Sequence, residues 1–161
     1  MTVVHVLGIG SPFGEDQAGF RLVERLREEG FRSPISGISL VFETLDRPGW
    51  GLLEILRQAD RAILVDAMRS GREPGTLARL GAGDLIDEFG PLTTHDVGVR
   101  TTLALGQTLG LIPRGLVVFG IEIGPVSASP SLREFRPSEA MVRAFKKALE
   151  EELAGDWLKR T

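Results

Sequence analysis

Acidic side chains and one histidine in this sequence have the types and positions that could hold a divalent metal ion. Glu15 and Asp16 stand together in GEDQAG, Asp66 ends the apolar run AILVDAM, and His95 lies in the polar segment TTHDVG. Carboxylate oxygen and imidazole nitrogen together suit a borderline ion such as Zn²⁺ or Ni²⁺. Two carboxylates and one imidazole would leave coordination positions open, as a site that serves chemistry requires.

The same acidic pair argues against the phosphate site that a glycine-rich turn usually suggests. The segment VLGIGSPFGEDQAGF contains Gly8 and Gly10, but its Gly-x-Gly-x-x-x-Gly spacing misses the dinucleotide-binding pattern by one residue. No Gly-Lys-Ser/Thr follows it either. Glu15 and Asp16 near a helix N-terminus would repel a phosphate, although the helix dipole also stabilises carboxylates there without a ligand. The two glycines also have a plainer explanation, a turn that lets the backbone approach the sheet. A nucleotide- or phosphate-binding α/β enzyme remains an alternative.

Strands and helices are predicted to alternate along the chain, and this order decides where the acids and the histidine lie. Apolar runs predict strands at 3–9, 38–43, 61–68, 75–80 (an edge strand) and 115–123, and amphipathic runs predict helices at 16–29, 49–59, 96–110 and 138–154. We therefore expect an α/β fold, a three-layer α/β/α sandwich with a mostly parallel twisted sheet of about five strands and helices on both faces. Ligands of such sheets bind beyond the carboxyl ends of the strands. Asp16, Asp66 and His95 are all predicted to lie at that edge.

Composition excludes several other classes of protein. The 161 residues carry a net charge of −3 and no cysteine, which excludes a disulfide framework and a thiol nucleophile. We expect a single domain over residues 1–161. The basic pair Lys146-Lys147 is too small for a nucleic-acid surface, and no apolar run approaches the length of a membrane-spanning helix. The N-terminus lacks the basic region of a signal peptide, so a cytoplasmic location is expected.

In their order along the chain, these features resemble the nickel-iron hydrogenase maturation endopeptidases. That family has a first strand, a Gly-x-Gly-Asn turn and a pair of acids, then an acid that ends a central strand before a Pro-Gly-Thr loop, then a histidine before a helix. The corresponding segments here are GIGSPFGEDQAG, ILVDAMRSGREPGTL and TTHDVG. The later FGIEIGPVSASPSLREFRPSEAMVRAF is similar to the family's last strand, loop and helix. The resemblance covers nearly the whole chain.

The resemblance implies an endopeptidase that removes a C-terminal peptide from the large-subunit precursor of a nickel-iron hydrogenase after nickel insertion. It makes Asp16, Asp66 and His95 the metal-contacting and catalytic residues, with nickel supplied by the substrate. Docking of that nickel would recognise and orient the precursor. A divalent ion can polarise the scissile carbonyl or activate a water, so no serine or cysteine nucleophile is expected. His95 or a carboxylate could also act as the general base.

The chain departs from the family pattern in two segments. Ser11 replaces the usual Asn of the turn, and the pair of acids is Glu-Asp. Counting back from Gly19 selects Asp16 as the ligand; if the turn is aligned in a different register, Glu15 takes that place. Residues 43–50, ETLDRPGW, stand where many members have a glycine-rich loop that is thought to read the substrate, which leaves the choice of hydrogenase open. A non-catalytic chaperone of an immature metalloprotein is a second alternative. The sequence leaves the oligomeric state open, with a monomer among the possibilities.

Overall fold

The computed structural model describes residues 1–10, 17–81, 98–124 and 135–156. In chain order its elements are β1 (Thr2–Gly10), α1 (Gln17–Glu28), β2 (Ile38–Asp46), α2 (Gly51–Gln58), β3 (Arg61–Met68), β4 (Leu77–Gly81), α4 (Val99–Thr108), β5 (Gly115–Glu122) and α5 (Glu139–Ala154).

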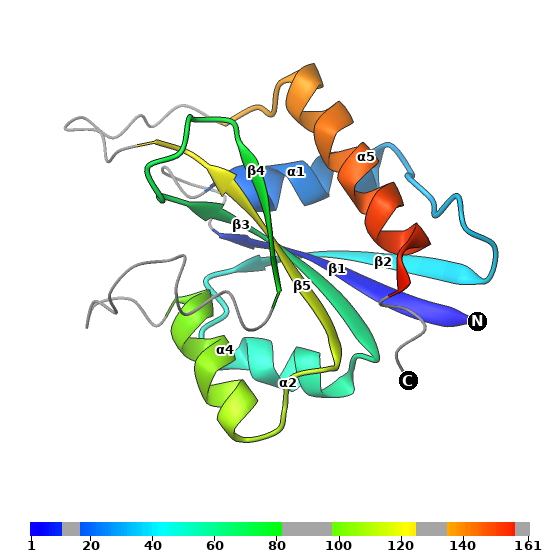
Figure 1. The fold of residues 1–161 in the computed structure, drawn as a ribbon, viewed down its shortest axis with the longest axis vertical. Coiled ribbons are helices and arrows are strands. Elements are labelled where there is room, and N and C mark those ends of the chain that lie inside the picture. The colour runs from blue at the N-terminus through cyan, green and yellow to red at the C-terminus, as the bar shows by residue number, and fades with distance from the viewer. Residues whose placement is uncertain (11–16, 82–97, 125–134, 157–161) are drawn as a thin grey trace.

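The strands form one five-stranded sheet in the order β2-β1-β3-β5-β4. β2, β1, β3 and β5 are parallel, and β4 pairs antiparallel with β5 at the edge of the sheet. Helices α1 and α5 cover one face of the sheet and α2 and α4 cover the other (Figure 1). The predicted three-layer α/β/α fold and the edge position of the fourth strand along the chain are both confirmed.

Two hydrophobic clusters, one on each face of the sheet, form the core. Val4 and Val6 of β1 join the cluster under α1 and α5, whereas Leu7 and Ile9 join the cluster under α2. All eight residues of β5 are buried. Strands of a parallel sheet are covered on both faces, so they read as continuous apolar runs, and this is why the sequence identified them.

Element bounds differ from the sequence prediction by a few residues. β2 continues to Asp46, three residues beyond its predicted end, because its backbone pairs with β1 as far as Gly10. α4 begins at Val99, after an extended Gly98, although its start was predicted at 96; residues 96 and 97 lie outside the described ranges. α5 begins as predicted, with the Ser138 hydroxyl accepting a hydrogen bond from the Met141 backbone N–H.

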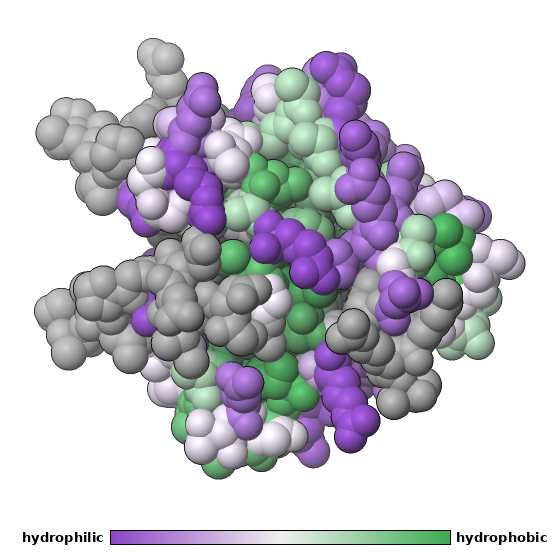
Figure 2. Space-filling model, in the orientation of Figure 1, coloured by the Kyte–Doolittle hydropathy of each residue, from purple (hydrophilic) through white to green (hydrophobic). Residues whose placement is uncertain are grey.

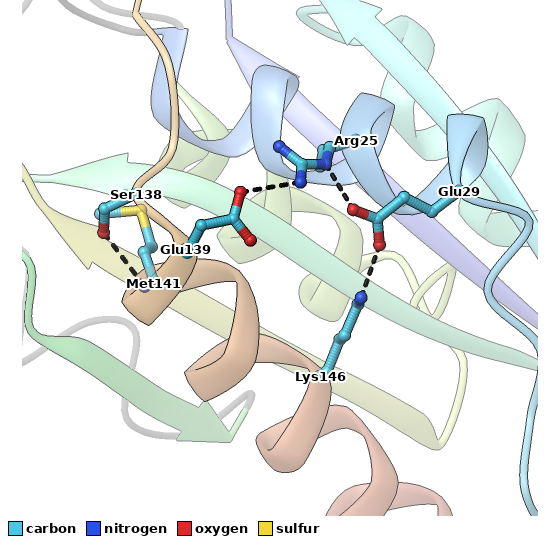
Figure 3. Close-up of polar contacts among 6 residues, drawn as sticks. All are labelled: Arg25, Glu29, Ser138, Glu139, Met141 and Lys146. Carbon is cyan, nitrogen blue, oxygen red and sulfur yellow. Dashed lines mark hydrogen bonds and ion pairs between the residues drawn. The ribbon is translucent and has the colours of Figure 1, made fainter.

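The outer sides of α1 and α5 are joined by charged side chains. Arg25 of α1 contacts both Glu29 of α1 and Glu139 of α5, and Lys146 of α5 also contacts Glu29 (Figure 3). Figure 2 shows hydrophilic residues along α5, with hydrophobic residues visible in the middle of the view, between α5 and the helices of the other face. Among the described residues, no helix is long and apolar enough to cross a membrane.

Candidate active site

Asp66 lies at the carboxyl end of β3, as the sequence predicts. Its side chain is partly buried, and its backbone is in register with Gly120 of β5. β1 pairs with β3 only as far as Val65, so Asp66 is the first residue of β3 beyond the β1 ladder. The described ends of β1, β3 and β5 and the N-terminal ends of α1 and α4 lie on the same side of the molecule, at the left of Figure 1. Asp66 therefore lies where parallel sheets bind their ligands.

Helix α1 begins directly on the backbone of β3 beside Asp66. A Cβ atom placed on Gly19 would lie 2.3 Å from the Val65 carbonyl oxygen and 2.9 Å from the Asp66 Cα. Both neighbours are backbone atoms, which cannot move aside as a flexible side chain can. Only glycine at this position allows the first turn of α1 to lie this close to β3.

A second glycine contact fixes the same helix against β1. A Cβ atom on Gly8 would lie 2.7 Å from the Val23 Cβ and 2.8 Å from the Gly19 carbonyl oxygen. The described half of the glycine-rich segment therefore serves helix–strand packing, the plainer of its two interpretations. The Gly8 contact matters for the site because it holds the start of α1 against the end of β1.

The end of β2 is tied to the end of β1. Arg47 has a left-handed backbone, with φ of 43°, and its N–H donates to the Gly10 carbonyl over 2.8 Å. Its guanidinium contacts the exposed Asp46 carboxylate at 3.0 Å. Trp50, the last residue of the segment 43–50, is 49% exposed. An unusual backbone and an exposed aromatic side chain thus occur beside the strand ends.

The structure adds a buried carboxylate at this edge that the sequence analysis missed. Glu122 ends β5, is only 2% exposed and lies in register with Met68 of β3. Its carboxylate accepts hydrogen bonds from the Ser70 N–H at 2.9 Å and the Ser70 hydroxyl at 2.8 Å. Burial acts to raise the pKa of Glu122, but hydrogen bonds from Ser70 and from the backbone N–H groups of Gly124 and Gly71 outweigh it and lower that pKa. An acid inside the apolar run FGIEI was the available signal, the same signal that selected Asp66.

Gln17 is a second missed residue, and it lies at the first position of α1. Its side chain is 2% exposed, and its Oε1 accepts hydrogen bonds from the Phe135 N–H at 3.1 Å and the Arg21 Nε–H at 3.3 Å. Gln17 thus links the start of α1 to the chain that leads into α5. Nothing in its sequence position distinguished it from an exposed polar residue of a helix.

Two of the three predicted ligands fall outside the described residues. Asp16 directly precedes Gln17 in the chain, and His95 lies three residues before Gly98, but the structure describes neither, nor Glu15. Within the described ranges, no three His, Asp or Glu groups could hold a metal ion. The donor set of Asp16, Asp66 and His95 suits a borderline divalent ion by its chemistry. Their convergence on one ion stays a prediction.

The comparisons with known proteins agree with one another. The family model of the hydrogenase maturation proteases matches residues 48–154. The chain belongs to this hydrogenase maturation protease family. It is 32% identical over 152 residues to the hydrogenase expression/formation protein HupD of Thiocapsa roseopersicina, covering 90% of this chain and 65% of that protein. It is 30% identical to HupM of Azotobacter chroococcum mcd 1, covering 87% and 69%. The chain thus spans about two thirds of the length of these relatives.

Solved structures of the family share the fold. The hydrogenase maturating endopeptidase HybD of E. coli aligns with a TM-score of 0.61 and 23% identity, over 95% of this chain and 90% of that one. The [NiFe] hydrogenase maturation protease HycI of Thermococcus kodakarensis KOD1 aligns with a TM-score of 0.61 and 21% identity, over 96% and 94%. At these identities the structural likeness supports the α/β fold of the family.

Proposed function

We propose that this protein is an endopeptidase that removes the C-terminal peptide of a nickel-iron hydrogenase large-subunit precursor after nickel insertion. The observation that carries the proposal is the position of Asp66. It lies at the carboxyl end of a central strand, where Gly19 lets the start of α1 contact the strand backbone. Membership of the maturation protease family supplies the reaction class. The expected cytoplasmic location is part of the same proposal.

The proposed site uses Asp16, Asp66 and His95 to contact nickel that arrives in the precursor. Nickel bound there would supply recognition and a Lewis acid beside the scissile bond. Asp66 contributes a carboxylate on a strand that is paired through its register with β5, so its backbone position is fixed before substrate binds. Such preorganisation lowers the entropy cost of orienting the peptide. Either His95 or a carboxylate accepts the proton of the attacking water.

The proposal is tested by the intact mass of a large-subunit precursor after incubation with the wild-type protein. Nickel-loaded and nickel-free precursor are run in parallel. Gel filtration shows whether the protein and the precursor form a complex. Loss of a C-terminal peptide from the nickel-loaded sample alone is the expected result. A stable complex with unchanged precursor mass would instead support the metalloprotein chaperone. Binding of nucleotides in place of the precursor would support the nucleotide- or phosphate-binding enzyme.

A further inference from the structure

Glu122 holds the loop between β3 and β4 by both its side chain and its backbone. We call residues 69–76 the clamped loop. The Glu122 carboxylate accepts from the Ser70 N–H and hydroxyl, its carbonyl accepts from the Gly75 N–H at 2.8 Å, and its N–H donates to the Thr76 carbonyl at 2.9 Å. The clamped loop is thus fixed near both of its ends by one residue.

Donors from two separate segments, residues 70–71 and Gly124, converge on this carboxylate. Gly71 and Gly124, whose N–H groups contribute to the lowered pKa, have φ values of 84° and 83°, a conformation that an L side chain rarely adopts. The N–H groups of Ser70 and Gly71 are successive in the chain, and successive N–H groups in a turn can converge on an anion. The Ser70 hydroxyl, which donates to Glu122, in turn accepts from Arg72 at 3.1 Å. An ionised carboxylate satisfies several donors at once, whereas an amide presents its own N–H groups to some of them.

The clamped loop starts close to the candidate reaction centre. Met68 and Glu122 are in register, so the loop leaves the sheet two residues beyond Asp66. The Ile123 N–H donates to the Met68 carbonyl at 3.0 Å, which continues the β3–β5 pairing up to the loop. Losing the Glu122 carboxylate would release the loop at Ser70, while the backbone bonds of Glu122 to Gly75 and Thr76 would remain. Because Asp66 is held by strand pairing, its backbone would stay in place.

We propose that Glu122 is a positioning residue that fixes the clamped loop as a rigid rim for the substrate polypeptide. This inference rests on the proposed peptidase function and adds to it the residue that shapes its substrate-binding edge. A rim preformed by Glu122 spares the ordering cost that a loose loop would add to binding. Loss of the clamp therefore raises KM for the precursor and leaves kcat nearly unchanged.

The experiment compares Glu122→Gln with Glu152→Gln, a matched change at another buried carboxylate. Glu152 is 7% exposed and pairs with Arg79 of β4, near the C-terminal end of α5. Cleavage of the nickel-loaded precursor gives kcat and KM, and hydrogen exchange by mass spectrometry follows the amides of the clamped loop. Ser70→Ala, which removes one donor, gives a milder version of the same change if Glu122→Gln folds poorly.

Glu122→Gln should raise KM by about tenfold and speed exchange in the clamped loop, with kcat within about twofold of wild type. Ser70→Ala should also raise KM and speed exchange in the clamped loop, but by less. Glu152→Gln should change neither KM nor this exchange. Faster exchange with unchanged KM, or an effect confined to kcat, would contradict the proposal that the clamped loop contacts the substrate polypeptide. Unchanged exchange in the clamped loop of Glu122→Gln would contradict the claim that the Glu122 carboxylate fixes this loop. Failure of the wild type to cleave the precursor would instead contradict the proposed function, while the exchange data would still test the clamp.

Discussion

Helix α1 is held in two different ways on its two sides. Towards the carboxyl ends of the strands it contacts backbone through Gly19, where an added Cβ would meet the Val65 carbonyl oxygen at 2.3 Å. Towards α5 it is held by long charged side chains, including Arg25 and Lys146 (Figure 3). Backbone contacts tolerate no added atom, whereas partly exposed ion pairs adjust and contribute little. The close fit lies beside Asp66, the residue that the proposed reaction needs in a fixed place.

The largest effect is expected from Gly19→Ala. The new methyl group would displace α1 from β3, with an expected loss of about 3 kcal/mol in the free energy of unfolding and a loss of precursor cleavage. Gly106→Ala in α4 is the matched control, since its Cβ would meet the side-chain ends of Leu53 at 2.5 Å and Ile112 at 2.7 Å. Those ends can move and alanine favours the helix, so the change should be within about 1 kcal/mol. Urea unfolding measures both, and equal losses would contradict the comparison.

Arg79→Ala should have an intermediate effect. It removes a guanidinium 2.6 Å from the Glu152 carboxylate, which is 7% exposed, and should lower the free energy of unfolding by about 2 kcal/mol. Arg57→Ala, which breaks an exposed pair with Glu54 on α2, should leave thermal stability unchanged. Thermal unfolding of the two variants tests the contrast. A larger loss in Arg57→Ala would show that burial of the carboxylate does not decide the cost.

Acid should selectively weaken the Glu122 contacts. Its pKa is lowered in the folded protein, so its contribution to stability is fully present above the ordinary value of 4.5 and is lost as pH falls through the lower folded value. Wild type should therefore exceed Glu122→Gln in stability most clearly above pH 4.5, with the difference shrinking in more acidic solution. Unfolding curves across this pH range measure the difference. A difference that stays constant on acidification would mean that folding does not lower the pKa of Glu122.

The smallest effect is expected from Lys146→Ala on the outer α1–α5 surface. The Lys146 ammonium contacts Glu29, but both side chains are about one-third exposed, at 32% and 29%. The melting temperature should stay within about 1 °C of wild type. High salt should remove even that difference. A loss as large as that of Gly19→Ala would overturn the view that this surface contributes little.

Much of the fold could be predicted because strands and helices differ in the period of their apolar residues. The buried runs 61–68 and 115–123 identified β3 and β5 almost to the residue, and Ser138 marked the start of α5. The extension of β2 to Asp46 could not be predicted, because it depends on pairing with β1 rather than on its own composition.

The candidate site was predictable where an acid interrupts an apolar strand. That signal located Asp66, and the same signal was present at Glu122 but was not used. The fit of Gly19 against Val65 and Asp66 was not predictable, since it depends on two segments far apart in the chain. Gln17 was missed for the same reason, because its partner Phe135 is distant in sequence.

The most direct test of the account is the cleavage rate of nickel-loaded precursor with Asp66→Asn and Asp46→Asn, followed by intact mass. Both residues are acids at the carboxyl end of a strand, but Asp46 is exposed and pairs with Arg47. Asp66→Asn should lower the rate by at least about a hundredfold while the precursor still binds, and Asp46→Asn should stay within about threefold of wild type. Full activity in Asp66→Asn would contradict the proposal that the end of β3 is the reaction centre.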